Sequence, residues 1–310
     1  MKREKENIFA SAVVPVHNEE MWIAEAVESA LAQARDDLEI VVVDDGSTDR
    51  TPEILSAYSF PVRVITQEKQ GVSVARNRAI EEARGKWIAF LDADDRWLPG
   101  HINAIEQAAR QEPEAGLVCT DALVIDSEGN RIKKKPAPSS GRDTFFSLLI
   151  ANHVITSAAA VRREVLEETG TFMPGLKRAQ DWDLWLRVAA RFPVVHSPRI
   201  TVEYRRQQKP SVQNQGTSIR DDNLYVISRA LKLRDVPDTV RRKALANCYL
   251  ESAVRLLAGL DTRGARKELL SALRHHFFLP SAWALFPASL AGPGLVKKAL
   301  TWKRQRERKA

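Results

Sequence analysis

The stretch Lys86–Asp95 constrains the fold more than any other part of this 310-residue sequence, because a short apolar run ends there in three carboxylates. An apolar run of this length with charged ends predicts a buried strand. Asp92, Asp94 and Asp95 should then lie where the strand leaves the sheet. Carboxylates this close repel one another unless a cation binds them. Mg²⁺ or Mn²⁺, held by one or two carboxylates and by substrate phosphates, would serve, and a solvated acidic turn is the plainer alternative.

Two earlier apolar runs, Ile8–Val16 and Leu38–Val43, predict strands that are each followed by a polar turn and a helical pattern. Such units are typical of a parallel sheet covered by helices on both faces. Ligands bind such sheets beyond the carboxyl ends of the strands. The pair Asp44-Asp45 and the cluster at Asp92 both fall at this edge of the predicted sheet.

A third short strand, Val62–Thr66, precedes a helix that should begin at Gly71. Glycine allows the backbone to approach a ligand closely. The helix N-terminus, together with Arg76 and Arg78, favours an anion. Ordinary surface arginines are the alternative explanation.

Short patterns elsewhere in the chain predict a helix cap, a loop and further helices and strands. We expect Asn18 to cap a helix that runs to about Ala34, and Lys133–Lys135 to lie in a solvated basic loop. Asp181 should stand at the start of the helix Arg178–Ala189, as a cap or a partner of the helix dipole. The remaining patterns predict, in chain order, a helix at Pro99–Gln111, a strand at Glu114–Ile125, helices at Asp143–Ile150 and Arg163–Thr169, and strands at Ser157–Val161 and Phe192–Tyr204.

Charge is distributed unevenly along the chain. Residues 1–219 contain 28 Lys/Arg and 32 Asp/Glu, a net charge of −4, whereas residues 220–310 contain 19 and 8, a net charge of +11. Helical patterns replace strands from Ile219 onward. The chain is therefore expected to be a binding or catalytic body with a basic helical appendage that faces an anionic partner.

The segment Phe277–Val296 holds 20 uncharged residues, which is long enough to cross a bilayer. Three prolines and two glycines interrupt it, and Lys297-Lys298 follow it. An element that lies on an anionic leaflet is the favoured interpretation, with ordinary packing and a membrane span as alternatives. Nucleic acid is not expected, because the aromatic residues are not interleaved with Lys and Arg.

The cysteines Cys119 and Cys248 fit neither a disulfide framework nor a metal knuckle, so a reducing compartment is expected. No secretory signal is visible at the N-terminus. These features predict a cytoplasmic protein, at the inner face of the membrane if the appendage binds lipid.

Five motifs, in this order and spacing, resemble those of the family-2 inverting glycosyltransferases with the GT-A fold. They are Val14–Glu19, Val42–Asp49, Gly71–Asn77, Phe90–Asp95 and Gln180–Arg187. The resemblance covers roughly Ala12 to Arg206. It implies an α/β fold with a mostly parallel sheet flanked by helices, in a catalytic domain over residues 1–218, with residues 219–310 as the helical C-terminal region.

The resemblance also assigns roles to residues. The donor, most simply a UDP-sugar, would contact Pro15, Val16, Asn18, Glu19, Asp44, Gly71, Arg76, Asp92 and Ala93. Asp44 would face the base, Asp94 would bind Mg²⁺ or Mn²⁺, and Asp181 would be the catalytic base rather than only a cap. The implied reaction is one in-line displacement, with inversion, by a hydroxyl of a lipid-linked or cell-surface glycan.

Two departures from the family pattern leave a second function open. Gln180 stands where the family often has Glu, and Arg206-Gln207 follow Tyr204-Arg205 where relatives often have a histidine. A catalytically impaired nucleotide-sugar-binding or scaffold protein of the same fold is therefore the alternative.

Overall fold

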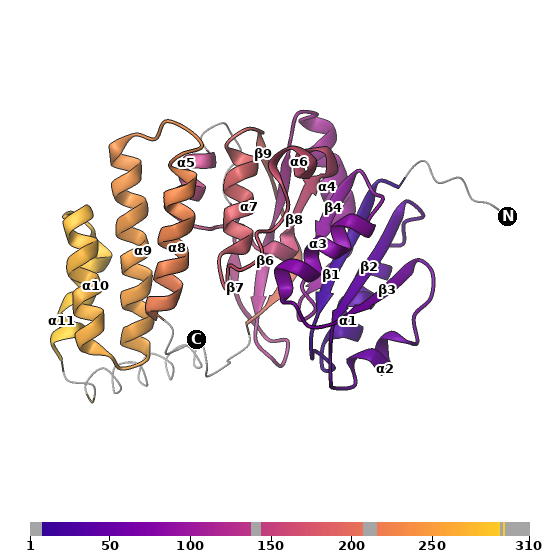
Figure 1. Ribbon diagram of the computed structural model, residues 1–310, viewed down its shortest axis with the longest axis horizontal. Coiled ribbons are helices and arrows are strands. Elements are labelled where there is room, and N and C mark those ends of the chain that lie inside the picture. Colours follow the sequence, from indigo (N-terminus) through magenta and orange to yellow (C-terminus); the bar gives the residue numbers. More distant parts are fainter. Residues whose placement is uncertain (1–7, 138–143, 207–215, 292–293, 295–310) are drawn as a thin grey trace. The chain divides into compact units, whose positions relative to one another are not determined.

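The computed structural model describes residues 8–137, 144–206, 216–291 and 294, and the chain divides into two compact units (Figure 1). Unit 1 comprises residues 1–148, 153–176 and 180–207. Unit 2 comprises residues 149–152, 177–179 and 208–310. The predicted domain boundary at 218/219 falls in the first turn of a helix, α8 (Gly216–Ala230), and stays a prediction.

Unit 1 is built on one sheet, which has nine strands within the described residues, in the order β3-β2-β1-β4-β8-β6-β9-β5, with β7 paired to β6. The strands are β1 (Ala10–Val16), β2 (Leu38–Asp45), β3 (Val62–Gln67), β4 (Trp87–Phe90), β5 (Arg96–Trp97), β6 (Leu117–Ile125), β7 (Arg131–Lys135), β8 (Ala159–Arg162) and β9 (Val194–Arg205).

The sheet is mixed rather than mostly parallel. β1, β2, β3 and β4 pair in parallel, because a helix connects each of them to the next. β8 then pairs antiparallel with both β4 and β6, β9 runs parallel to β6, and β5 and β7 are antiparallel to their neighbours. The tight turn between β6 and β7 allows only an antiparallel pair. The predicted α/β architecture is confirmed, with this correction to the sheet.

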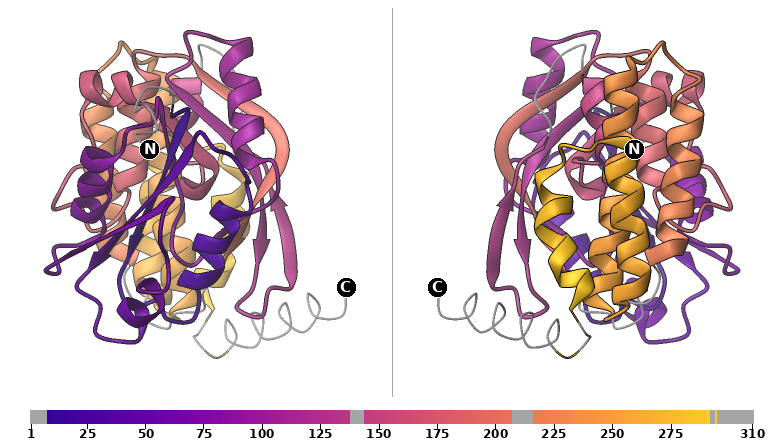
Figure 2. Two further views of the ribbon diagram at one scale, coloured as in Figure 1. Left: turned by 90° about the vertical axis from the view of Figure 1, so that its right-hand side faces the viewer. Right: turned by 90° about the vertical axis from the view of Figure 1, so that its left-hand side faces the viewer.

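Both faces of the sheet are buried, and helices lie on both of them (Figure 2). Alternate residues of a strand point to opposite faces. On one face, residues such as Val14 and Ile40 form a core with Ile23 of α1 (Ile23–Leu31) and Ile105 of α4 (His101–Gln111). α2 (Thr51–Leu55) contributes Leu55 to the same core.

On the other face, α3 (Val72–Glu82) contacts β1 and β2, and α7 (Gln180–Ala189) contacts β6. Phe90 of β4 packs there against Phe172, with ring centroids 5.3 Å apart, and against Trp185 of α7, at 5.7 Å. The short elements α5 (Thr144–Ile150), η1 (Thr156–Ala158) and α6 (Arg163–Thr169) complete the connections. The tryptophans of α7 are therefore core residues, as their helical spacing predicted.

Two local predictions were wrong, and one short strand was not predicted. The first helix begins at Ile23, and Asn18 is not its cap but a loop residue with φ of 54°. Lys133–Lys135 belong to β7, because the preceding turn brings them back along β6. The two-residue strand β5 was not predicted, because it is too short to show a periodic pattern.

Unit 2 is helical, as expected from the sequence. α8 is followed by α9 (Asp238–Ala258), α10 (Thr262–His275) and α11 (Pro280–Leu290). α9 packs against α8, α10 and α11, and Asp261 caps α10 by accepting a hydrogen bond from the Gly264 N–H at 2.8 Å.

None of the helices in the described residues is long and apolar enough to span a bilayer. Part of the segment Phe277–Val296, including Pro293, lies outside the described residues, as do Lys297-Lys298.

Candidate active site

The loops that follow β1 and β2 are fastened to each other by hydrogen bonds. Asn18 donates its main-chain N–H to Ser47 Oγ at 2.9 Å, and its side-chain oxygen accepts from the Thr48 N–H at 2.7 Å. The Glu19 N–H donates to Thr51 Oγ1 at 3.0 Å. The left-handed backbone at Asn18, which Asn tolerates better than most residues, turns the first loop toward the second. Two separate sequence motifs thus form one rigid edge of the sheet.

Asp45 fastens a third loop to the same edge. Its carboxylate accepts from the N–H groups of Gln70 and Gly71, at 2.8 and 2.7 Å. Gly71 has φ of 97°, which favours glycine, at the start of α3. Gly46 is also constrained, because a Cβ there would lie 2.9 Å from the Lys69 nitrogen. The end of β2 and the N-terminus of α3 are therefore held together by Asp45.

These loops enclose an open cavity of about 250 Å³ at the carboxyl ends of β1, β2 and β4. It is lined by Pro15, Val16, His17, Glu19, Asp45, Val72, Ala75, Arg76, Asp92, Ala93 and Asp94. Seven of the ten residues predicted to hold donor or metal lie in this lining. The cavity has both apolar walls and charged groups, as a site for an amphiphilic anion requires.

The other three predicted donor residues, Asn18, Asp44 and Gly71, do not line the cavity. Asp44 is buried and accepts from the Ser47 N–H at 3.0 Å. The contact of Asp44 with a base therefore stays a prediction, and the next residue, Asp45, is the one that borders the cavity.

Arg76 is the buried cation of the cavity wall. It is 6% exposed, and its Nη2 donates to Asp92 Oδ1 at 2.5 Å. Its guanidinium lies 5.1 Å from the centroid of the Phe172 ring, and its Nε has no hydrogen-bond partner. A buried arginine with an unused donor can bind an anion that enters the cavity.

Asp95 anchors the acidic loop to the second half of the sheet. Its carboxylate accepts from Ser157 Oγ at 2.5 Å and from the Arg205 N–H at 2.7 Å. The pKa of Asp95 is raised well above its ordinary value, first by burial and then by the charges of Asp94 and Asp92. Ser157 also accepts from the Asp92 N–H at 3.0 Å, so it fixes both ends of the loop.

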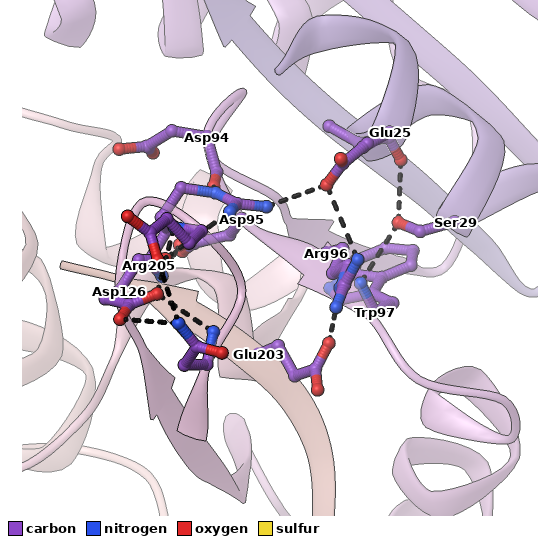
Figure 3. A network of polar contacts seen from close by, with 12 residues as sticks. Glu25, Ser29, Asp94, Asp95, Arg96, Trp97, Asp126, Glu203 and Arg205 are labelled. Carbon is purple, nitrogen blue, oxygen red and sulfur yellow. Dashed lines mark hydrogen bonds and ion pairs between the residues drawn. The ribbon is translucent and has the colours of Figure 1, made fainter. Parts of the chain in front are cut away.

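Arg205 holds the backbone beneath Asp94 (Figure 3). Its Nε donates to the Asp94 carbonyl at 2.9 Å, and its Nη2 donates to Glu25 Oε2 at 2.7 Å. The guanidinium lies 3.9 Å from the centroid of the Trp22 ring. Glu25 also contacts Arg96, at 3.5 Å. The side chain of Arg205 is only 3% exposed, so the acidic loop rests on a buried cation rather than on solvent.

Asp181 lies beside this loop although it is far away in sequence. Its Oδ2 accepts from Thr156 Oγ1 at 3.4 Å, and Thr156 is the neighbour of the Ser157 that holds Asp92 and Asp95. Asp181 stands in the first turn of α7, where the helix dipole favours negative charge.

The pKa of the Tyr204 hydroxyl indicates that several carboxylates lie near this side chain. Burial raises the pKa of its hydroxyl, and four carboxylates raise it further, in the order Asp95, Asp92, Asp94 and Asp181. Charges act on a side chain in this way only over short distances. The acidic loop and Asp181 therefore face one region next to Tyr204.

The donor set fits a divalent metal held partly by substrate. Within the described residues there is no group of three His, Cys, Asp or Glu side chains placed to bind a metal. Asp92 and Asp94 both line the cavity, however, and Mg²⁺ commonly binds through one or two carboxylates and substrate phosphates. Asp94 is the candidate that the family resemblance indicates, and Asp92 is paired with Arg76.

Four residues of the lining were not predicted from the sequence: His17, Asp45, Val72 and Ala75. Each lies inside a motif that was recognised, next to a residue that was chosen. His17 donates its Nδ1–H to the Asp45 carbonyl at 2.9 Å, and its Nε2 accepts from the Lys69 ammonium at 2.6 Å. The motifs located the site, but they did not determine which side chains face the cavity.

Comparison with known sequences identifies the family. The sequence profile of glycosyl transferase family 2 matches residues 11–170, more than half of the chain. The chain belongs to glycosyl transferase family 2. The matched range contains the cavity lining and the loop Asp92–Asp95, and it ends before Asp181.

Relatives in this family are similar over part of their length. The chain is 35% identical over 199 residues to the uncharacterised protein y4gI of Sinorhizobium fredii, and 32% identical over 196 residues to chondroitin synthase of Escherichia coli. Each match covers 62% of this chain, but 21% and 28% of those proteins. The chain thus spans between about a fifth and three tenths of the length of these relatives.

Solved structures share the fold at low identity. TarS of S. aureus, residues 1–349, has a TM-score of 0.60 and 18% identity, and the match covers 95% of this chain and 92% of that one. The mannosyltransferase PcManGT of Pyrobaculum calidifontis, in complex with GDP-Man and Mn²⁺, has a TM-score of 0.61 and 23% identity, over 96% and 83% of the two chains. The GT-A expectation is confirmed by these likenesses.

Proposed function

We propose that this chain is an inverting glycosyltransferase that moves a sugar from a nucleotide diphosphate sugar to an acceptor hydroxyl. The observation that carries the proposal is the placement of Asp181 beside the acidic loop whose Asp92 and Asp94 line the cavity. A donor site and a carboxylate base next to it are the two parts that such a reaction needs.

We take the donor to be a UDP-sugar bound with a divalent metal. TarS has been crystallised with UDP-GlcNAc and with UDP, and PcManGT with GDP-Man and Mn²⁺. In this chain the apolar segment Pro15-Val16 and the ring of His17 offer a wall for the nucleoside, and Arg76 offers positive charge to the diphosphate. When bound at Asp94, Mg²⁺ or Mn²⁺ would supply positive charge to the departing diphosphate.

In the proposed reaction the Asp181 carboxylate takes the proton of the acceptor hydroxyl while the oxygen of that hydroxyl attacks the anomeric carbon of the donor sugar. General base catalysis of this kind contributes roughly 10² to 10⁴-fold. Attack from the face opposite the leaving diphosphate inverts the anomeric centre, because no covalent intermediate forms. Thr156 Oγ1 and the helix N-terminus orient the carboxylate.

Turnover of a donor tests this function. Purified full-length chain, incubated with Mn²⁺, a panel of UDP-sugars and a panel of lipid-linked and soluble acceptors, should release UDP in an acceptor-dependent way. Binding of UDP without any turnover would favour the alternative, an impaired sugar-nucleotide-binding protein. That alternative draws on Gln180, whose amide donates to the Leu176 carbonyl at 2.9 Å instead of adding an acidic group.

We further propose that unit 2 binds an anionic membrane surface at the cytoplasmic face. Phe277 packs against Phe278 and against Trp283, and Phe277, Phe278 and Trp283 are 59%, 81% and 45% exposed. Exposed aromatics on a region with a net charge of +11 are typical of interfacial elements. Co-sedimentation of the full chain with anionic vesicles, but not with zwitterionic ones, is the expected result. Equal recovery with both vesicle types would contradict it.

A further inference from the structure

Asn77 and Arg187 end two of the five family motifs, and the proposed reaction uses neither of them. Both side chains bind the main chain of one segment, residues 169–172, which leads from α6 toward α7. Asn77 belongs to α3 and is 95 residues away from Phe172 in the sequence. The position of this segment therefore depends on distant side chains rather than on its own local sequence.

The side-chain amide of Asn77 binds both main-chain groups of Phe172. Its Nδ2 donates to the Phe172 carbonyl at 2.8 Å, and its Oδ1 accepts from the Phe172 N–H at 2.9 Å. A primary amide has a donor and an acceptor side by side, so it can make both bonds at once. Two bonds from one planar group fix the orientation of Phe172 as well as its position.

Arg187 of α7 binds the other end of the same segment. Its guanidinium donates to three consecutive carbonyls, at 2.5, 2.8 and 2.7 Å, those of Thr169, Gly170 and Thr171. Its Nε donates to Asp183 Oδ2 of the same helix at 2.9 Å. The segment is thus attached to α7, whose first turn contains Asp181.

The ring of Phe172 lies against the guanidinium of Arg76. Phe172 is only 1% exposed, and its ring centroid lies 5.1 Å from the guanidinium carbon. Phe90 and Trp185 pack on this ring in edge arrangements, with centroids at 5.3 and 6.4 Å. A cation over an aromatic ring is stabilised most when both are shielded from water. The ring and Asp92, which accepts from Arg76 Nη2, therefore fix the guanidinium from two sides.

Two adjacent residues of α3 thus contact the same phenylalanine, Asn77 through its main chain and Arg76 through its ring. Arg76 lines the cavity, whereas Asn77 and Phe172 do not. Arg76 Nε has no hydrogen-bond partner among the described residues, so it is a donor left for a ligand. The orientation of that donor depends on the ring beside it.

We propose that Asn77 and Phe172 are positioning residues for the donor diphosphate. Asn77 holds the main chain of Phe172, and the ring of Phe172 orients the Arg76 guanidinium toward the phosphates. Loss of either contact weakens the binding of a nucleoside diphosphate and leaves the binding of the nucleoside alone unchanged, because the nucleoside has no group for Arg76. This inference rests on the proposed function.

Calorimetric titration of the full-length chain with Mn²⁺ tests the two roles, with UDP as one probe and uridine, in competition with UDP, as the other. We expect Asn77→Ala to weaken UDP binding by roughly 10-fold and to leave the Kd for uridine within about twofold. Phe172→Leu, which keeps an apolar side chain but removes the ring, should have the same effect. In an Arg76→Gln background neither substitution should weaken UDP binding further, because both act through Arg76.

The matched control is Gln33→Ala. Gln33 is 9% exposed, and its Nε2 donates to the carbonyls of Ser29 and Leu98, both at 3.1 Å, so it is another enclosed amide that binds the main chain. It does not line the cavity. Its loss should lower stability without changing the ratio of the two dissociation constants. The same change of ratio in Gln33→Ala would attribute the effect to lost stability and overturn the positioning role.

The remaining outcomes separate the positioning role from the proposed function. Equal weakening of UDP and uridine, unchanged UDP binding in Asn77→Ala, or a full further loss in the Arg76→Gln background would overturn the positioning role alone. Failure of wild type to bind UDP would overturn the proposed function. Urea unfolding tests the contact without any nucleotide: the effects of Asn77→Ala and Arg76→Gln should be coupled, and additive effects would contradict it.

Discussion

The two halves of the unit 1 sheet differ in how they build their share of the site. In the parallel half, β1, β2 and β4 end at one edge, and their ends and following loops, together with the first turns of α3, supply the cavity lining from short contiguous motifs. In the mixed half, the residues around the acidic loop come from separate elements: Asp181 from α7, Thr156 and Ser157 from η1, and Arg205 from β9.

The difference has a physical origin. Parallel strands joined by helices place all their carboxyl ends together, so a motif after each strand automatically contributes to one site. The mixed half has no such rule, and each of its side chains is positioned by a particular long-range contact. We therefore expect donor binding to depend on the first half, and the acceptor and the base on the second.

The largest effect is expected at the cation site of the parallel half. Asp94→Asn should lower transfer by roughly 10³-fold or more, because the developing charge on the diphosphate loses its counter-charge. It should also abolish the strengthening of UDP binding by Mn²⁺, measured by calorimetry with and without the metal. The control is Glu68→Gln, which changes an exposed carboxylate in the loop between β3 and α3. UDP binding in Asp94→Asn that Mn²⁺ still strengthens would remove Asp94 from the metal site.

Arg205 tests whether the two halves depend on each other. Arg205→Gln removes the donors to the Asp94 carbonyl and to Glu25 from a buried position, and we expect it to lower the free energy of unfolding by about 2–3 kcal/mol. It should also weaken UDP binding in the presence of Mn²⁺, with partial recovery in Arg205→Lys. Arg199→Gln, exposed on the same strand, is the matched control. If Arg205→Gln binds UDP as tightly as wild type does, the contacts of Arg205 with Asp94 and Glu25 have only a structural role.

His101 should make the stability of unit 1 fall in acid. It is buried, it contacts Thr201 Oγ1 at 2.7 Å, and burial lowers its pKa from 6.5 to about 3. In the unfolded chain His101 therefore becomes protonated below pH 6.5, whereas in the folded chain it stays neutral down to about pH 3. The free energy of unfolding that is present above pH 6.5 is therefore partly lost as the pH falls. Between pH 7 and pH 5 this loss is about 2 kcal/mol.

Urea unfolding at the two pH values measures this loss in wild type and in His101→Gln. The variant should have the smaller pH dependence, whatever its absolute stability. Parallel pH profiles for the two proteins would contradict the assignment.

The smallest effect is expected outside the sheet, in unit 2. Phe278→Ser with Phe277→Ser should weaken binding to anionic vesicles by roughly 10-fold, the loss expected when two half-inserted aromatic rings are removed. Tyr225→Ser, another exposed aromatic of unit 2, is the control. If the double variant still binds anionic vesicles as wild type does, the positive charge of unit 2, and not the aromatic rings, accounts for the binding.

The sequence predicted the parallel half better than the mixed half for the same reason. Apolar runs that end in Asp44-Asp45 and in Asp92–Asp95 identify strand ends locally, so the edge of the sheet and the region of the cavity followed from short patterns. The orientation of single side chains did not follow, as Asp44 and Asp45 show. β7 was mistaken for a loop because an exposed edge strand of lysines has no apolar alternation. The role of Arg205 depends on partners far away in the chain, Asp94 and Glu25.

The most direct test of the account is Asp181→Asn, because Asp181 is the residue of the mixed half on which the proposed chemistry depends. UDP release and acceptor glycosylation are measured beside UDP and Mn²⁺ binding, with the exposed Glu167→Gln as control. We predict that turnover falls by roughly 10² to 10⁴-fold while the Kd for UDP stays within about twofold. Turnover close to that of wild type would contradict the convergence of base and donor site on which the proposal rests.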